Sequence, residues 1–258
     1  MIERLRVSGA RLTDRLTEPW HQTFYTLMTT AMRGVCFTFG RYQVIGVAHV
    51  PRGGPLIVVS NHLNNADPPL LGAAIPRRIR FMAKQELFEG KAGALYRWFG
   101  AFPVRRFEAD LAALRQAQQI LKDGGVLGMF PEGHRSDGKG LGPPHPGTAL
   151  VALRTGAPLL PVGITGTEAV RTPKVLLQRP RIRVVIGEPF HLTGSRRITA
   201  EQVRDGTEEI MHQIAALLPA QYRGIYADGG AAHRDNATHR RPMPRAGVAH
   251  PETVPETR

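Results

Sequence analysis

A short apolar run, residues 55–59, is followed by a polar stretch and then by the helix-start sequence Asp67-Pro68-Pro69. The run is rich in β-branched residues and follows a glycine pair, a pattern that predicts a buried strand. We expect Asp67 at the N-cap of the next helix and Pro68 at its first position. His62 therefore lies just past the end of a strand, where open α/β sheets place their ligands.

His62 and Asp67 form a candidate catalytic pair. The loop between them is short enough to return the carboxylate to the imidazole ring. A carboxylate bonded to one ring nitrogen fixes the tautomer and raises the basicity of the other nitrogen, which makes a general base. Taken singly, an aspartate before proline at a helix start is usually only a cap, and a histidine in such a loop is more often a surface or satisfied loop residue than a catalyst. The pair therefore predicts catalysis only in the company of further polar groups.

The remaining chain alternates strand and helix patterns. Strands are predicted at residues 41–45, 79–83, 101–104, 125–130, 159–164 and 182–186. A broken helix is predicted at 85–99, and helices are predicted at 108–122, with Leu111, Leu114 and Leu121 on one stripe, at 148–154, and behind a capping box at Thr199 and Gln202. Pro161 favours an edge strand or a strand start for residues 159–164. The order predicts an α/β domain over residues 40–226, with a mixed, largely parallel sheet flanked by helices.

Residues 1–39 are expected to form a two-helix hairpin at a membrane surface. In the first helix, arginines surround an apolar stripe made of Ile2, Leu5, Leu12 and Leu16. This basic amphipathic pattern is typical of a helix that lies on a membrane, and equally of one packed on its own domain. The second helix, residues 24–37, is more apolar, is interrupted by Arg33 and is too short to span a bilayer. Residues 227–258 have no apolar period and are expected to be a disordered tail.

The net charge of +13 implies attraction to a polyanion: nucleic acid, anionic lipid or a phosphorylated substrate. No nucleic-acid recognition motif is present, so we expect no nucleic-acid partner. The single cysteine, Cys36, indicates a reducing compartment, and the first residues lack a secretion signal. We therefore expect a peripheral or monotopic protein on the cytoplasmic side of the cell membrane. The sequence contains no Cys/His cluster of the kind that binds zinc, and we expect no cofactor or metal.

Polar groups follow two further predicted strands, Arg105-Arg106 after one and Glu132 to Arg135 after another. Strand ends of an open α/β sheet can converge on one crevice. A base, guanidinium groups and a carboxylate together suit a substrate that carries a hydroxyl and a phosphate, because arginine forks bind phosphate bidentately. The alternative is that each arginine is a solvated surface charge and Glu132 a turn residue. Because no covalent nucleophile is evident, the pair would activate a hydroxyl of the substrate itself.

Four blocks of this sequence, in the right order between residues 40 and 190, resemble the 1-acyl-sn-glycerol-3-phosphate acyltransferase family. The blocks are Asn61-His62-Leu63-Asn64-Asn65-Ala66-Asp67, Gly100-Ala101-Phe102-Pro103-Val104-Arg105-Arg106, Phe130-Pro131-Glu132-Gly133-His134-Arg135-Ser136 and Leu160-Pro161-Val162-Gly163-Ile164. The resemblance implies that fatty acyl groups pass from acyl-CoA or acyl carrier protein to the free hydroxyl of 1-acyl-glycerol-3-phosphate. The product would be phosphatidate, made in phospholipid biosynthesis.

The resemblance also assigns roles to individual residues. His62 would be the general base, oriented by Asp67, and Pro161 would shape the acyl-donor side. The remaining residues would bind the acceptor: Arg106 and Arg135 its phosphate, Glu132 and Gly133 its glycerol part, with Arg105 and Ser136 in the same site.

Two positions depart from the family pattern. His134 replaces a threonine, and Arg105 replaces an acidic residue or asparagine. Another lysophospholipid or a non-glycerol acceptor is therefore an alternative. A catalytically silent lipid-binding protein at the membrane surface is a second alternative.

Overall fold

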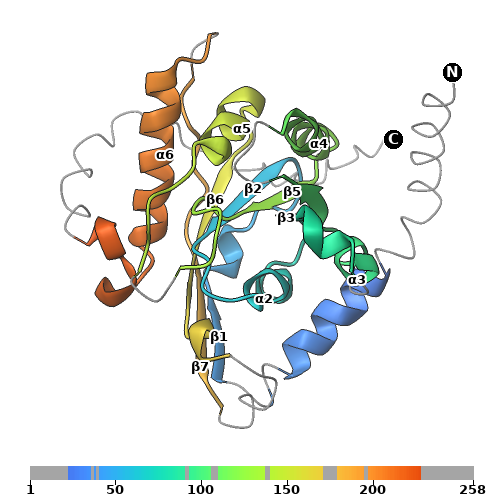
Figure 1. Cartoon of the computed structure of the whole chain (residues 1–258). Coiled ribbons are helices and arrows are strands. Elements are labelled where there is room, and N and C mark those ends of the chain that lie inside the picture. The colour runs from blue at the N-terminus through green and yellow to red at the C-terminus, as the bar shows by residue number, and fades with distance from the viewer. Residues whose placement is uncertain are drawn as a thin grey trace, which may run out of the picture.

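A computed structural model describes residues 23–35, 38, 41–90, 93–105, 110–136, 140–170, 179–194 and 197–227. A seven-stranded sheet lies at the centre, in the order β1-β7-β6-β2-β5-β3-β4 (Figure 1). The strands are β1 (Arg41–Ile45), β2 (Leu56–Ser60), β3 (Ile79–Lys84), β4 (Phe102–Val104), β5 (Val126–Met129), β6 (Leu159–Thr165) and β7 (Arg181–Ile186).

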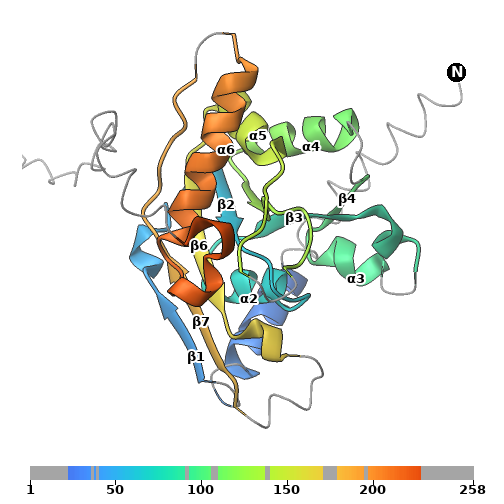
Figure 2. The same ribbon diagram turned by 60° about the vertical axis from the view of Figure 1, so that its left-hand side comes forward.

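The sheet is mixed and mostly parallel, which confirms the sheet that was predicted for the α/β domain. Only β6 and β7 pair antiparallel among the neighbouring strands described. The main helices are α2 (Asp67–Ala74), α3 (Gly93–Trp98), α4 (Leu111–Lys122), α5 (Gly147–Thr155) and α6 (Ala200–Ala215). Figures 1 and 2 show α4, α5 and α6 together on one side of the sheet and α2 on the other.

Burial on both faces explains the sequence of β2, in which every residue is buried. Ile57 and Val59 pack in the core beneath α4, α5 and α6, whereas Leu56 and Val58 pack in the core that contains α2. A strand covered on both faces reads as a continuous apolar run, because neither side of the pleat meets water. The prediction of a buried strand from the run at residues 55–59 is therefore confirmed.

Two local predictions were wrong. Ala66, not Asp67, is the N-cap of α2, because the Asp67 carboxylate turns back toward the preceding loop. Leu111 was expected on one stripe with Leu114 and Leu121, but it is 59% exposed at the first position of α4, whereas Leu121 is buried. The capping box of α6 is confirmed: Gln202 N–H donates to the Thr199 hydroxyl, and Thr199 N–H donates to the Gln202 side chain.

Pro161 lies inside the sheet rather than at an edge, since β6 is flanked by β2 and β7. Leu159 pairs with Phe190, and Val162 pairs with Ile186. Between these two pairs the chain advances three residues along β6 but four residues along the partner segment. The extra residue is a bulge opposite Pro161. Bulges are one of the few interior positions at which a sheet tolerates proline, because a ladder donor is dispensable there.

One N-terminal helix, residues 23–35, is described, and the predicted first helix of the hairpin lies outside the described residues. The helix packs on its own domain through Tyr25, which is 4% exposed and accepts a hydrogen bond from Ile79 N–H. Arg33 donates to the carbonyl of Ala73 in α2. In the described part of the chain, no helix has the length and apolar character to cross a membrane.

Candidate active site

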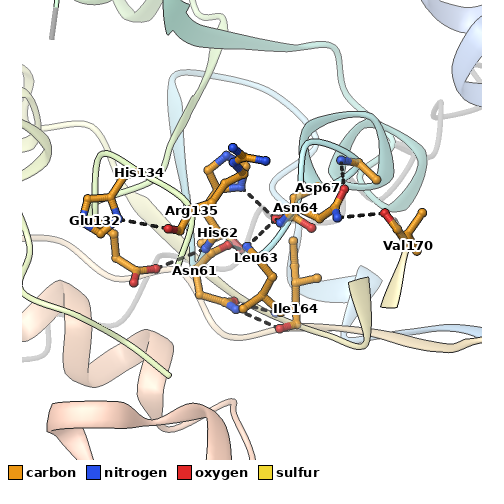
Figure 3. A network of polar contacts seen from close by, with 12 residues as sticks. Asn61, His62, Leu63, Asn64, Asp67, Glu132, His134, Arg135, Ile164 and Val170 are labelled. Atoms are coloured by element: carbon orange, nitrogen blue, oxygen red, sulfur yellow. Dashed lines mark hydrogen bonds and ion pairs between the residues drawn. The ribbon is translucent and has the colours of Figure 1, made fainter. Parts of the chain in front are cut away.

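His62 and Asp67 meet as the sequence predicted. Their Nδ1 and Oδ2 atoms are 2.8 Å apart, and the carboxylate is fully buried (Figure 3). An ionised carboxylate only accepts hydrogen bonds, so Nδ1 carries the proton and Nε2 is the basic nitrogen. The same Oδ2 accepts the N–H groups of Leu63 and Asn64, each at 2.7 Å. The loop backbone therefore holds the carboxylate that holds the ring.

Phe130 fixes the imidazole ring from its flat side. The two rings are stacked, with centroids 4.1 Å apart and planes 19° apart, and Phe81 stacks behind Phe130. The His62 side chain is 10% exposed. A ring bound at its edge by Asp67 and covered on a face by Phe130 has little freedom to rotate, which favours a positioned base.

Asn61 fastens the end of β2 to β6. Its side-chain amide donates to the carbonyl of Ile164 at 2.9 Å and accepts Ile164 N–H at 2.8 Å. Backbone pairing between β2 and β6 ends at Ser60 and Val162. The Asn61 side chain thus takes the place of the backbone hydrogen bonds between β2 and β6. It does so one residue before His62, where the chain leaves the sheet. Because Asn61 and Ile164 are both buried, water could not replace Asn61 as the partner of the Ile164 N–H or carbonyl.

Glu132 joins the loop of the base to a second loop. One carboxylate oxygen accepts His62 N–H at 3.2 Å, and the other accepts Gly142 N–H at 3.1 Å. The side chain is completely buried, and burial raises the pKa of this carboxyl above its usual range, against the effect of the two N–H groups. Glu132 follows β5, the sheet neighbour of β2, so strand adjacency brings it beside His62.

A cavity of about 520 Å³ adjoins this arrangement. Its lining residues come from three segments and are Glu132, His134, Arg135, Ser136, Gly140, Leu141, Gly142, Pro143, Gly224 and Ile225. Ser136 connects the cavity to the base, because its N–H donates to the carbonyl of His62 at 2.7 Å. Arg135 and His134 are exposed, so the cavity offers cationic and imidazole groups to a ligand.

The far wall of the cavity belongs to residues 220–226, which we call the C-terminal strap. The strap pairs with Leu141, whose N–H donates to the Tyr222 carbonyl and whose carbonyl accepts Ile225 N–H, each at 3.1 Å. The Tyr222 hydroxyl donates to the Glu168 carboxylate, which lies beyond β6. Burial, and then this carboxylate, raises the pKa of Tyr222 to about 12, so its hydroxyl stays protonated and donates at neutral pH.

The chain is similar to proteins described as acyltransferases. Residues 41–165 match the model of the family described as Acyltransferase. A 1-acyl-sn-glycerol-3-phosphate acyltransferase of Bacillus subtilis is 27% identical over 75% of this chain and 96% of its own length. Residues 41–165 of this chain belong to the acyltransferase family.

Two further relatives of this acyltransferase agree in fold and sequence. The human 1-acyl-sn-glycerol-3-phosphate acyltransferase alpha is 29% identical over 77% of this chain and 62% of its own length. The crystal structure of the 1-acyl-sn-glycerophosphate (LPA) acyltransferase PlsC from Thermotoga maritima superposes with a TM-score of 0.57. It is 25% identical and covers 75% of this chain and 79% of its own.

The structure brings some of the predicted acceptor residues together and separates others. Glu132, Arg135 and Ser136 line the cavity beside His62. Arg105 lines a different cavity, of about 350 Å³, because it follows β4, which lies three strands away from β2. At roughly 4.8 Å between strands, that is about 14 Å along the sheet. Arg106 lies outside the described residues.

Asp110 sets the position of Arg105. Its carboxylate accepts the N–H groups of Arg105, Ala112 and Ala113 and so caps α4. These backbone hydrogen bonds, that from Arg105 foremost, lower the pKa of Asp110. The prediction that α4 begins at residue 108 overlooked this cap, which the sequence offers as an aspartate just before an alanine- and leucine-rich run.

Gly133 and Pro161 have clear local reasons for their identity. Gly133 has a φ of +69°, and a Cβ atom there would lie 2.6 Å from Cδ2 of His145. Only glycine fits this left-handed and crowded position. Pro161 is buried in β6 beside Val59, and its carbonyl accepts Gly187 N–H at 2.9 Å. Their assignment to the glycerol part and to the acyl-donor side stays a prediction.

Sequence reasoning gave no role to Asn61, to Phe130 or to the C-terminal strap. Asn61 and Phe130 stood inside the recognised blocks, directly before His62 and directly before Pro131-Glu132, so position in the motif was the available signal. The strap carried no signal, because its contact with Leu141 joins segments far apart in the chain through main-chain groups.

Proposed function

We propose that this acyltransferase transfers a fatty acyl group from a thioester to the free hydroxyl of 1-acyl-glycerol-3-phosphate and so forms phosphatidate. One observation carries the proposal: His62 and Asp67 form a buried, ring-oriented pair beside a cavity that presents Arg135. The relatives named above are described as enzymes of this activity, and one of them matches over nearly its whole length.

The chemistry follows from the state of the imidazole. Nε2 of His62 takes the proton of the acceptor hydroxyl as that oxygen attacks the thioester carbonyl carbon. The tetrahedral intermediate collapses with cleavage of the carbon–sulfur bond, and the imidazolium returns the proton to the departing thiolate. Asp67 stabilises the imidazolium in between, because the charged ring donates Nδ1–H to a buried carboxylate.

The acceptor's phosphate is assigned to the exposed end of the cavity. Arg135 and His134 lie there, and a guanidinium group binds phosphate oxygens bidentately. Glu132 acts as a positioning residue in this scheme, since both its oxygens accept backbone N–H groups.

Site-directed variants and a substrate panel test the proposal. The purified protein is incubated with acyl-CoA or acyl carrier protein and a series of lysophospholipids, and products are identified by mass spectrometry. We expect phosphatidate from 1-acyl-glycerol-3-phosphate, and a loss of about 10²–10⁴-fold in kcat for His62→Ala. His191→Ala, a change at an exposed histidine, is the matched control. Wild-type turnover in folded His62→Ala would refute the mechanism.

We also propose that the enzyme works at a membrane surface. The helix over residues 23–35 and α3 touch through Phe24 and Trp98, whose ring centroids are 4.8 Å apart. Beside this contact, Leu27, Leu95 and Trp98 are each about half exposed or more. Exposed aliphatic and indole groups of this kind suit the bilayer interface. The double variant Leu27→Asp with Leu95→Asp should sediment less with anionic vesicles. Unchanged sedimentation would mean that these side chains do not make the membrane contact.

A further inference from the structure

Three arginines form a compact group at one margin of the sheet. Arg41 of β1 is the direct partner of Arg181 in β7, and Arg183 stands two residues further along β7, opposite Gln43. Partner strands are about 4.8 Å apart and residues two apart in a strand about 6.6 Å. All three arginines are exposed. We call this group the arginine face.

The arginine face carries charge that no ion pair neutralises within the described ranges. No ion pair links Arg41, Arg181 or Arg183 to an acidic residue within the described ranges. Residues 169–186 contain five basic residues and no acidic one. Like charges directly opposite each other in a sheet are destabilising. The arrangement therefore weakens the fold unless an anionic partner neutralises it.

Protection of a sheet edge does not explain the arrangement. Charged residues commonly protect an edge strand from pairing with another chain, and β1 is such a strand. However, Arg181 and Arg183 belong to β7, which is hydrogen-bonded to strands on both sides. Core packing does not explain it either, since the alternate residues Ile182 and Val184 are the buried ones. The arginines thus face away from the core that contains α2.

The arginine face lies at the active-site end of the sheet. Arg183 pairs with Thr165, the residue after Ile164, and Ile164 is the residue that Asn61 binds next to His62. Only β6 separates β7 from β2, which is about 10 Å across the sheet. Figure 2 shows β1 and β7 extending below the end of α6, so this margin is not covered by that helix.

The shape and surroundings of the arginine face favour a protein partner. It is a flat strand surface, whereas a nucleotide such as the coenzyme A moiety is usually bound in a concave site. A bilayer contact combines basic with apolar groups, and the exposed apolar side chains Leu27, Leu95 and Trp98 belong to other elements. Acidic side chains three and four apart on a helix are spaced by about 5–6 Å, close to the spacing of these arginines.

We propose that the arginine face docks an acidic helical surface of a carrier protein that delivers the acyl thioester. This assignment rests on the proposed acyl transfer and specifies its donor. Charge complementarity would raise the rate of encounter and orient the carrier, so that its flexible thioester arm reaches His62 from the adjacent strand end. Acyl-CoA has no such protein surface and would not use the arginine face.

The test compares two donors in one variant. Arg181→Glu with Arg183→Glu reverses the charge, and Arg52→Glu with Arg115→Glu is a control with the same change in net charge at exposed sites elsewhere. We expect kcat/KM with acyl carrier protein to fall about tenfold or more, with steep salt dependence in the wild type, while kcat/KM with acyl-CoA stays near the wild-type value. The thermal midpoint should not fall, because the charge repulsion between Arg41 and Arg181 is removed.

Direct binding separates this proposal from the proposed function. Acyl carrier protein is titrated into the wild type and both double variants by calorimetry, without any turnover. Binding by the wild type and the control, but not by the Arg181/Arg183 variant, supports docking even if no product forms with either donor. Equal carrier binding in all three proteins, or none in the wild type, would overturn it. Loss of sedimentation with anionic vesicles but not of carrier binding would reassign the arginine face to lipid.

Discussion

Replacing Asn61 should loosen the active site without touching the reacting groups. In Asn61→Ala, the N–H and carbonyl of Ile164 both lose their partner, and both are buried. In Asn61→Asp, one oxygen still accepts the N–H, but the other places negative charge against the Ile164 carbonyl. We therefore expect the aspartate variant to be less stable than the alanine variant at neutral pH.

The magnitude follows from the two hydrogen bonds. A buried main-chain group left without a partner costs about 1–3 kcal/mol, so Asn61→Ala should lower the free energy of unfolding by about 3 kcal/mol or somewhat more. For a chain of this size, a change of 3 kcal/mol shifts the thermal midpoint by about 6–12 °C. Because Asn61 precedes His62 directly, displacement of the base should also lower kcat, by up to about 10²-fold.

Asn65→Ala provides the control. It is the same substitution in the same loop, at an exposed residue, and should change stability by no more than about 0.5 kcal/mol. Urea denaturation followed by circular dichroism measures all three variants, and kcat is measured well below each thermal midpoint. If Asn61→Ala matched Asn65→Ala, or if Asn61→Asp were as stable as the wild type, the Asn61–Ile164 contact would not be what secures this loop.

Three further results are expected. Asp67→Asn should lower kcat by about 10²-fold or more, because no charge then stabilises the imidazolium. It should cost less stability than Asp67→Ala, because the amide oxygen can still accept the loop N–H groups. A kcat equal to that of the wild type would contradict this. Asp110→Ala should destabilise by about 1 kcal/mol at pH 7. Since the native pKa of Asp110 is lowered, that deficit should shrink as the pH falls below 3.8, and a pH-independent deficit in urea titrations would exclude the cap. A chain ending at Ala227 should keep full activity. A chain ending at Leu218 lacks the C-terminal strap and should bind the acceptor more weakly, which is measured as a higher KM.

The contact between His62 and Asp67 was predictable from sequence because its geometry is local. His62 and Asp67 are joined by one short loop, and the apolar strand and the Asp-Pro-Pro sequence fix both ends of that loop. Glu132 was predictable as a neighbour only on the assumption that its strand pairs with β2, which the structure bears out. These successes depend on periodicity and helix-start signals, which are written in consecutive residues.

The failures arise from strand order and main-chain contacts. No local sequence pattern shows that β5 lies next to β2 whereas β4 lies three strands away. For this reason Arg105 was grouped with Glu132, although Arg105 lines a separate cavity. Pro161 suggested an edge, because the bulge that accommodates it depends on residues 186–190, far along the chain. The C-terminal strap binds Leu141 through backbone atoms alone, and such contacts leave no trace in side-chain identity.

Glu132 makes the loop of the base and the cavity loop mechanically dependent on each other, since one buried carboxylate holds the N–H of His62 and that of Gly142. Anyone who wishes to redirect the enzyme to a new acceptor will be drawn to residues 140–143, because they line the cavity and are distant in sequence from the catalytic pair. A graft that moves Gly142 N–H would leave half of the Glu132 carboxylate unpaired and shift the base as well. Acceptor loops exchanged between homologues should therefore be chosen by the backbone conformation at residue 142 before any side chain is considered.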